Sequence, residues 1–153
     1  LPLERLLDEF TRAGLVGILS HPERNRGILG KPKVLRPLVE RGLLLQVTAG
    51  SLTGGFGSQI EKFAETLVAQ GLVHFISTDA HGTKSRPPII GRAFDRVVKL
   101  TGEETAIDLC CRNPGKVANG AAVSGGRRGS KNFAQTGWVR RTFSSEPAGV
   151  GTI

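Results

Sequence analysis

Two histidines and one aspartate have the positions and side-chain types of metal ligands. His21 directly follows the apolar segment 15–20, and Asp79 and His81 follow a second apolar segment, 72–77. Imidazole nitrogen together with carboxylate oxygen suits Zn²⁺, Mn²⁺ or Fe²⁺. In an extended Asp-x-His segment both side chains lie on one face, so both can reach one ion. The spacing alone leaves a second interpretation open, in which Asp79 caps a turn and the histidines are polar surface residues.

The segments around these residues alternate between helical and strand patterns. Apolar residues from Leu3 to Phe10 recur at i, i+3, i+4 and i+7, which is typical of one helical face. The predicted helices cover about residues 2–13, a segment that Pro32 opens and Gly42 closes, 58–70, 89–100 and 101–111, with a short final turn that ends near Asn119. The predicted strands are 15–20, 43–48 and 72–77.

This alternation predicts an α/β fold. Continuous apolar strands that alternate with amphipathic helices are typical of parallel strands covered by helices. About three strand–helix units cannot close a barrel, so we expect a strand edge to stay exposed. Functional groups of parallel α/β proteins gather at the carboxyl ends of the strands. His21, Asp79 and His81 are therefore expected at one rim of the sheet.

Capping signals mark several of the expected helix starts. Ser58 with Glu61, and Thr101 with Glu104, have the spacing of the capping box. Asn113 stands directly before a proline and is expected to cap the short final turn.

The positive charge of the chain is not arranged as in a nucleic-acid-binding protein. The net charge is +8, with 16 Lys/Arg against 12 Asp/Glu in residues 1–119 and 5 against 1 in residues 120–153. Binders of single strands concentrate basic residues in a groove with interleaved aromatic side chains. The excess here is spread over loops and the C-terminal segment, so we expect no nucleic-acid partner. Spare arginines suit an anionic substrate equally well.

The composition favours a cytoplasmic protein without membrane insertion. No apolar run approaches the roughly 20 residues that cross a bilayer, and no basic segment precedes an apolar one as in a signal peptide. Cys110 and Cys111 are adjacent and cannot form a disulfide framework, so a reduced pair on a helix is expected. The chain begins at Leu1 rather than Met, which indicates that further sequence precedes it.

Three separated segments agree in order and spacing. They are 17–25, which contains His-Pro-Glu-Arg-Asn, 46–57, which contains Gln-Val-Thr-Ala-Gly-Ser, and 74–81, which ends in Asp-x-His. Together they resemble the C-terminal half of the PHP-family tyrosine-protein phosphatases of bacterial capsule and exopolysaccharide synthesis. The pair Asn113-Pro114 also fits, and the resemblance covers about residues 1–119.

The resemblance implies a metal-dependent enzyme. It implies part of a distorted (β/α)₇ barrel with Mn²⁺, or alternatively Zn²⁺ or Fe²⁺, at its rim, and it makes His21, Asp79 and His81 metal ligands. Arg24 would bind the substrate phosphate, and Arg86 is a second candidate for that role. A guanidinium matches two phosphate oxygens at once. The alternatives are an Arg24 salt bridge with a neighbour such as Glu23, and a structural role for Arg86.

The implied reaction is hydrolysis of phosphotyrosine in proteins by a metal-activated water. The implied substrate is a bacterial tyrosine kinase of polysaccharide export. The family begins with a His-x-His on its first strand, which has no counterpart in this chain, so the fragment by itself is expected to lack part of the ligand set. Two alternatives stay open: another PHP phosphoesterase acting on a small ester such as histidinol phosphate, and a non-catalytic remnant.

The C-terminal segment differs in character from the rest. Residues 120–153 are rich in Gly, Ser and Arg and show no apolar periodicity. Such a composition favours disorder. We therefore divide the chain into a phosphatase-type domain, 1–119, and a tail, 120–153, that is either an extension or the product of a shifted reading frame.

Overall fold

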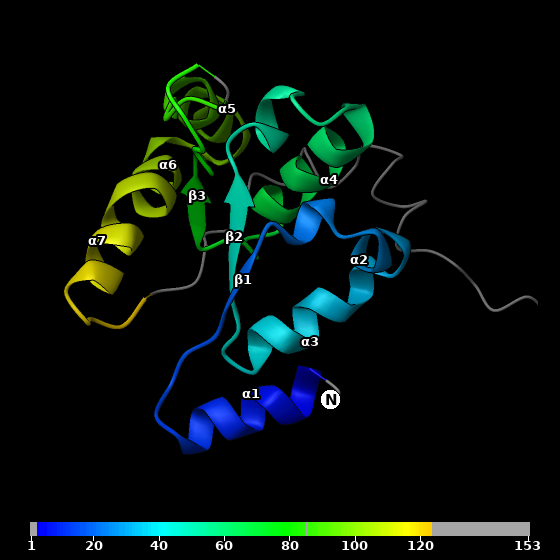
Figure 1. Cartoon of the computed structure of the whole chain (residues 1–153), viewed down its shortest axis with the longest axis vertical. Coiled ribbons are helices and arrows are strands. Elements are labelled where there is room, and N and C mark those ends of the chain that lie inside the picture. The colour runs from blue at the N-terminus through cyan, green and yellow to red at the C-terminus, as the bar shows by residue number, and fades with distance from the viewer. Residues whose placement is uncertain (1–2, 85, 124–153) are drawn as a thin grey trace, which may run out of the picture.

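Short strands and helices alternate along the chain in the computed structural model, which describes residues 3–84 and 86–123 (Figure 1). The α-helices are α1 (Leu3–Arg12), α2 (Arg26–Gly30), α3 (Leu35–Glu40), α4 (Ser58–Ala69), α5 (Gly91–Thr101), α6 (Glu103–Ile107) and α7 (Asn113–Ala118). The strands are β1 (Ile18–Ser20), β2 (Leu44–Thr48) and β3 (Phe75–Ser77). The 3₁₀ turns are η1 (Pro22–Arg24), η2 (Pro32–Val34) and η3 (Ser51–Thr53), and the π-helical segment η4 (Asp108–Arg112) joins α6 to α7.

The strands form one parallel sheet in the order β1-β2-β3. Ile18 lies opposite Leu44, and Gln46 lies opposite Phe75. The predicted α/β fold with three parallel strands is therefore confirmed. In the part of the chain that the structure describes, β1 and β3 each have one neighbouring strand, so the expected exposed edge is present as well.

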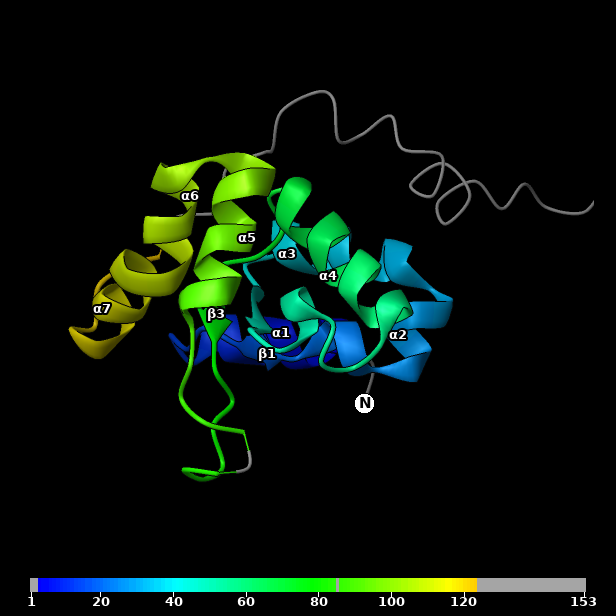
Figure 2. The same ribbon diagram turned by 90° about the horizontal axis from the view of Figure 1, so that it is seen from above.

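Helices lie on both sides of the sheet. Figures 1 and 2 agree that α2, α3 and α4 lie on one side of the strands and α6 and α7 on the other. α1 lies near the amino ends of the strands, and the loop after β3 projects from the body in Figure 2. The buried apolar side chains form one cluster, whose fully buried members include Leu35, Leu45, Val47, Phe63, Leu67, Val97 and Leu109.

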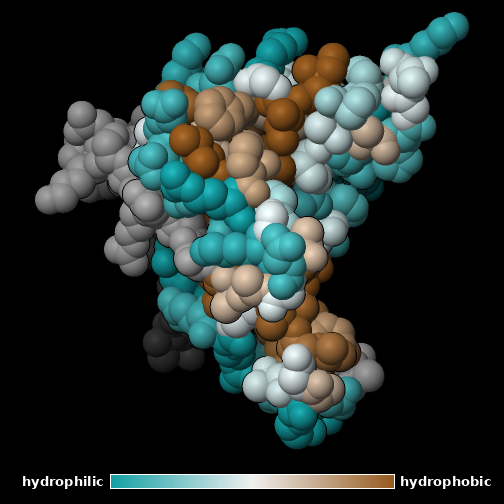
Figure 3. Space-filling model, turned by 90° about the vertical axis from the view of Figure 1, so that its left-hand side faces the viewer, coloured by the Kyte–Doolittle hydropathy of each residue, from teal (hydrophilic) through white to brown (hydrophobic). Residues whose placement is uncertain are grey.

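Apolar side chains also remain exposed near β1. Leu15, Val16 and Ile18 are 59%, 67% and 45% exposed. Figure 3, which views the side that carries α6 and α7, shows apolar surface reaching the lower end of the molecule, where α1 lies. Within the described residues, no helix is both long and apolar enough to cross a membrane.

Both predicted capping boxes are wrong. Gly57 precedes α4 with a φ of 91°, and Gly102 precedes α6 with a φ of 95°, and neither helix start has a side-chain cap. Ser58 is the first residue inside α4, and the Thr101 hydroxyl donates to the carbonyl oxygen of Val97 in its own helix. At both helix starts a glycine with positive φ occupies the N-cap position, where the capping side chain would have to stand.

Two further local predictions need correction. Asn113 does not cap a turn, because its backbone is helical and its side chain donates to the carbonyl oxygen of His74 at 2.9 Å. The helix α2 was not predicted, although Asn25 caps it by accepting a hydrogen bond from the amide of Ile28 at 3.1 Å. The predicted tail, 120–153, lies outside the described residues beyond position 123.

Candidate functional site

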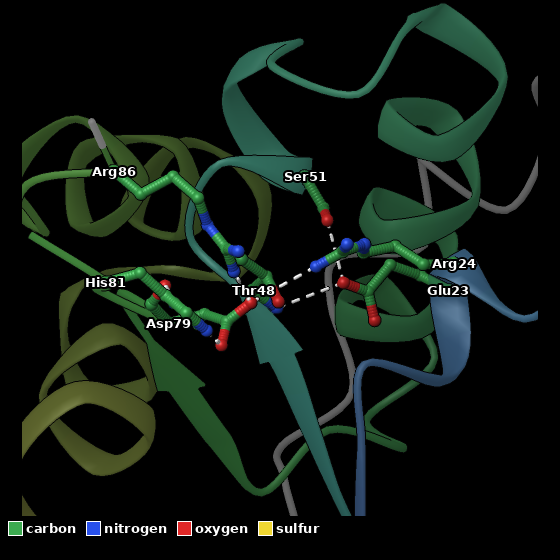
Figure 4. Close-up of polar contacts among 7 residues, drawn as sticks. All are labelled: Glu23, Arg24, Thr48, Ser51, Asp79, His81 and Arg86. Atoms are coloured by element: carbon green, nitrogen blue, oxygen red, sulfur yellow. Dashed lines mark hydrogen bonds and ion pairs between the residues drawn. The ribbon is translucent and has the colours of Figure 1, made fainter.

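Three loops at the carboxyl ends of the strands supply the site (Figure 4). The His-Pro-Glu-Arg turn follows β1, the glycine-rich segment around η3 follows β2, and the loop from Asp79 to Arg86 follows β3. The register of the sheet brings these strand ends to one rim, as the alternation of strands and helices predicts.

Asp79 is the centre of the cluster. Its Oδ2 accepts a hydrogen bond from Nη1 of Arg24 at 3.1 Å and a second ion-pair contact from Nη2 of Arg86. The side chains are partly exposed, with 30% for Arg24, 22% for Asp79 and 37% for Arg86. Two guanidinium groups from separate loops thus converge on one carboxylate oxygen. Arg24 therefore forms a salt bridge, as the alternative to phosphate binding expected, but its partner is Asp79 and not Glu23.

His81 lies beside this carboxylate. Its Nδ1 is 2.7 Å from the backbone oxygen of Asp79 and 3.9 Å from Oδ1 of the same residue. A carbonyl oxygen only accepts, so this contact requires a proton on Nδ1, and Nε2 is then the ring nitrogen that could bind a metal ion. The His81 side chain is 60% exposed. This tautomer is the one a metal-binding imidazole uses when its other nitrogen is held by a carbonyl group.

His21 lies at the same rim but apart from this pair. It directly follows β1, and its amide donates to the carbonyl oxygen of Gln46 at 2.9 Å. Among residues 3–84 and 86–123, no three His, Cys, Asp or Glu side chains form a group that could hold a metal ion. The structure therefore joins Asp79 with His81, and ligation of one ion by all three residues stays a prediction.

The backbone of the site is locally strained. Of the described residues other than glycine, only His21, Asp79 and Arg86 have a positive φ, at 42°, 51° and 55°. This left-handed region is uncommon for residues with a side chain, and such residues concentrate at functional sites. All three belong to the predicted site, so the strained positions and the predicted site residues coincide.

The buried carboxylate of Glu23 links the turn after β1 to the segment after β2 by hydrogen bonds. It is fully buried, and its Oε1 accepts hydrogen bonds from the amide of Thr48 at 3.1 Å and the hydroxyl of Ser51 at 2.7 Å (Figure 4). Its Oε2 has no hydrogen-bond partner in the described part of the chain. Sequence reasoning missed this role, because the direction of the Glu23 side chain depends on a partner 25 residues away.

Phe56 is a second residue that sequence reasoning missed. The guanidinium carbon of Arg24 lies 4.2 Å from the centre of the Phe56 ring, which is a cation–π arrangement. The sequence feature that could have identified Phe56 is that it is the single aromatic residue of the loop between β2 and α4.

Residues 2–119 match the family model described as "Capsular polysaccharide synthesis, CpsB/CapC". This chain belongs to the CpsB/CapC family. The resemblance drawn from its three motifs is therefore confirmed.

Named relatives and a solved structure agree with the CpsB/CapC assignment. The chain is 43% identical over 83 residues to the tyrosine-protein phosphatase YwqE of Bacillus subtilis, covering 54% of this chain and 33% of that protein. It is 39% identical over 101 residues to the putative tyrosine-protein phosphatase CapC of Staphylococcus aureus, covering 65% and 40%. A crystal structure from a study of YwqE and of CpsB from Streptococcus pneumoniae, described as unique metal-dependent tyrosine phosphatases, has a TM-score of 0.77 at 33% identity and covers 84% of this chain and 52% of that one.

The chain spans about a third to a half of the length of these CpsB/CapC proteins. The described site accordingly contains one carboxylate–imidazole pair and two arginines, and not a complete set of metal ligands.

Proposed function

We propose that this chain supplies the phosphate-binding arginines and part of the metal site of a protein-tyrosine phosphatase of capsule and exopolysaccharide synthesis. The observation that carries the proposal is the convergence of Arg24 and Arg86 on Asp79, with His81 beside it. The names of the relatives support tyrosine phosphate as the group that is hydrolysed.

The donor groups fit a divalent metal ion in kind but are incomplete in number. Asp79 offers Oδ1, His81 offers Nε2, and His21 on the neighbouring loop is the third proposed ligand. We propose Mn²⁺ as the ion, with Zn²⁺ or Fe²⁺ as alternatives for the same nitrogen and oxygen donors. When bound, the ion would supply an activated water and would stabilise charge on the phosphoryl group.

Arg24 and Arg86 are the groups with which this chain, by itself, could bind a phosphate. A guanidinium donates two parallel hydrogen bonds to phosphate oxygens and stabilises the charge that grows on them during hydrolysis. In the present arrangement Asp79 holds both arginines, so a phosphate group must compete with a fixed carboxylate.

We further propose that the sheet is part of a distorted (β/α)₇ barrel of the PHP type, formed by residues 1–119. The exposed edge of β1 and the exposed side chains Leu15, Val16 and Ile18 support further strands beside β1. The tail, 120–153, would lie outside this barrel. We place the protein in the cytoplasm, and we propose a phosphorylated bacterial tyrosine kinase of polysaccharide export as its substrate.

The experiment joins this chain behind the N-terminal half of the Bacillus subtilis relative, because the resemblance places the chain in the C-terminal half. Hydrolysis of a phosphotyrosine peptide and of histidinol phosphate is measured with and without a chelator. Faster, chelator-sensitive hydrolysis of the peptide is expected. Arg24→Ala should lower kcat/KM by about 10²–10³.

Arg41→Ala is the matched control, because Arg41 pairs with Asp8 at 3.5 Å near the opposite end of the sheet and is half exposed. It should leave the rate unchanged. Preferred hydrolysis of histidinol phosphate would reassign the substrate. A folded fusion with neither bound metal nor hydrolysis of either compound would show that this chain is a non-catalytic remnant.

A further inference from the structure

A cavity of about 300 Å³ has Arg86 in its lining. Ligand sites in proteins start at about this volume and combine apolar walls with a few polar groups. The apolar walls here include Phe56, Pro87, Ile89 and Ala93, and the polar lining includes Arg86 and Arg92.

The cavity is continuous with the place where a phosphate group would bind. Arg86 belongs both to the cavity wall and to the contact with Asp79. Phe56 belongs to the wall and lies under the guanidinium of Arg24 at 4.2 Å. A phosphate ester held by the two arginines would therefore have its organic group next to Phe56.

The loop fixes Phe56 in this place. A Cβ atom at Gly50 would come within 3.1 Å of Cε2 of the Phe56 ring, so the ring packs against a backbone without a side chain. The amide of Gly55 donates to the carbonyl oxygen of Gly50 at 2.8 Å, and a Cβ atom at Gly55 would meet that same oxygen at 3.1 Å. The glycines thus allow the loop to close tightly and to present a half-buried aromatic ring at a set position.

Another part of the wall is an exposed apolar side chain. Ile89 lies in the loop just before α5 and lines the cavity, and it is 63% exposed. Burial of an exposed apolar wall by a ligand is favourable, and aromatic rings gain further from contact with another ring. The walls therefore suit a flat apolar group better than a short alkyl chain.

We propose that this cavity receives the phenyl ring of phosphotyrosine, with Phe56 and Ile89 as specificity-determining residues. The inference rests on the proposed function, because it assumes that Arg24 and Arg86 bind the phosphate. It adds the reason why an aryl phosphate would be preferred over an alkyl phosphate.

The test measures binding of phenyl phosphate and methyl phosphate to the chain itself, by chemical-shift titration. Phenyl phosphate should bind about three- to tenfold more tightly. Ile89→Ala should remove most of this preference and leave the affinity for methyl phosphate unchanged, because the Ile89 side chain has no polar group that could bind a phosphate. Phe56→Leu should also reduce the preference, and Phe56→Tyr should restore it. Val34→Ala, at an exposed apolar residue outside the cavity, is the control and should change neither affinity.

The outcomes separate this inference from the proposed function. Equal affinity for the two phosphates, with both weakened by Arg24→Ala, would overturn the ring site and leave the phosphate site intact. A preference for phenyl phosphate that Ile89→Ala and Phe56→Leu leave unchanged would also overturn it. Failure of the chain to bind either phosphate would remove the phosphate site and, with it, the proposed function.

Discussion

The two ends of β3 carry histidines in opposite settings. At the amino end His74 is only 3% exposed, its Nδ1 accepts a hydrogen bond from the amide of Leu45 at 3.1 Å, and its carbonyl oxygen accepts one from Asn113. At the carboxyl end His81 is largely exposed, and its Nδ1 donates to the carbonyl oxygen of Asp79. The His74 ring thus accepts a hydrogen bond inside the fold, whereas the His81 ring donates one at the surface.

The difference explains what each end of the strand can do. Burial lowers the pKa of His74, so that the ring stays neutral and serves as a fixed acceptor for the sheet. The other end combines partly exposed charges with left-handed backbone at Asp79 and Arg86, a combination that stabilises the fold little and suits binding. The same residue type is thus structural where it is buried and accepting, and available for ligands where it is exposed and donating.

Replacement of each histidine by alanine tests this comparison with the largest expected effect. His74→Ala leaves the amide of Leu45 buried without its acceptor, so the free energy of unfolding should fall by about 2–3 kcal/mol. His81→Ala should change it by less than about 0.5 kcal/mol. Urea unfolding followed by circular dichroism measures both. Equal losses in the two variants would contradict the division between a structural and a binding end.

The pH dependence of stability offers a smaller effect. Unfolded His74 titrates near its ordinary pKa of 6.5, and burial lowers the pKa in the folded protein. Between these two values the unfolded chain binds more protons, so stability is complete above pH 6.5 and falls as the pH drops below it. The slope from one group cannot exceed about 1.4 kcal/mol per pH unit.

The measurement is the free energy of unfolding between pH 5 and pH 7.5. His74→Asn keeps an acceptor near the amide of Leu45 but does not titrate, so its curve should be flatter than that of the unsubstituted chain. His81→Ala should leave the slope as it is. A slope that persists in His74→Asn would assign the pH dependence to other groups.

The features that the sequence predicted are those that depend on neighbouring residues. Apolar periodicity identified α1, the three strands and the parallel sheet. A buried strand or helical face leaves a pattern of apolar residues in its own segment of the sequence. The expected rim followed from the same pattern, since parallel strands end at one edge. Asp79 and His81 are close because they are two residues apart.

The contacts of the site that escaped prediction depend on distant partners. Arg24 meets Asp79 across 55 residues, and Asn113 meets His74 across 39, so neither contact is visible in local spacing. Asn113 therefore resembled a helix cap, although its amide serves the far end of β3. The position of His21 relative to Asp79 could not be predicted for the same reason. It depends on the exact paths of two loops that leave different strands.

Asp79→Asn sharpens the comparison at the carboxyl end with the smallest effect. Asparagine keeps the shape of the side chain and tolerates the left-handed backbone at this position, but it removes the charge that holds Arg24 and Arg86. The ion pairs are partly exposed, so the free energy of unfolding should fall by less than about 1 kcal/mol. The freed guanidinium groups should bind inorganic phosphate about two- to fivefold more tightly, as followed by chemical-shift titration. Asp8→Asn, which releases only the remote Arg41, is the control. A weaker affinity for phosphate in Asp79→Asn would mean that the carboxylate positions the arginines for the anion instead of competing with it.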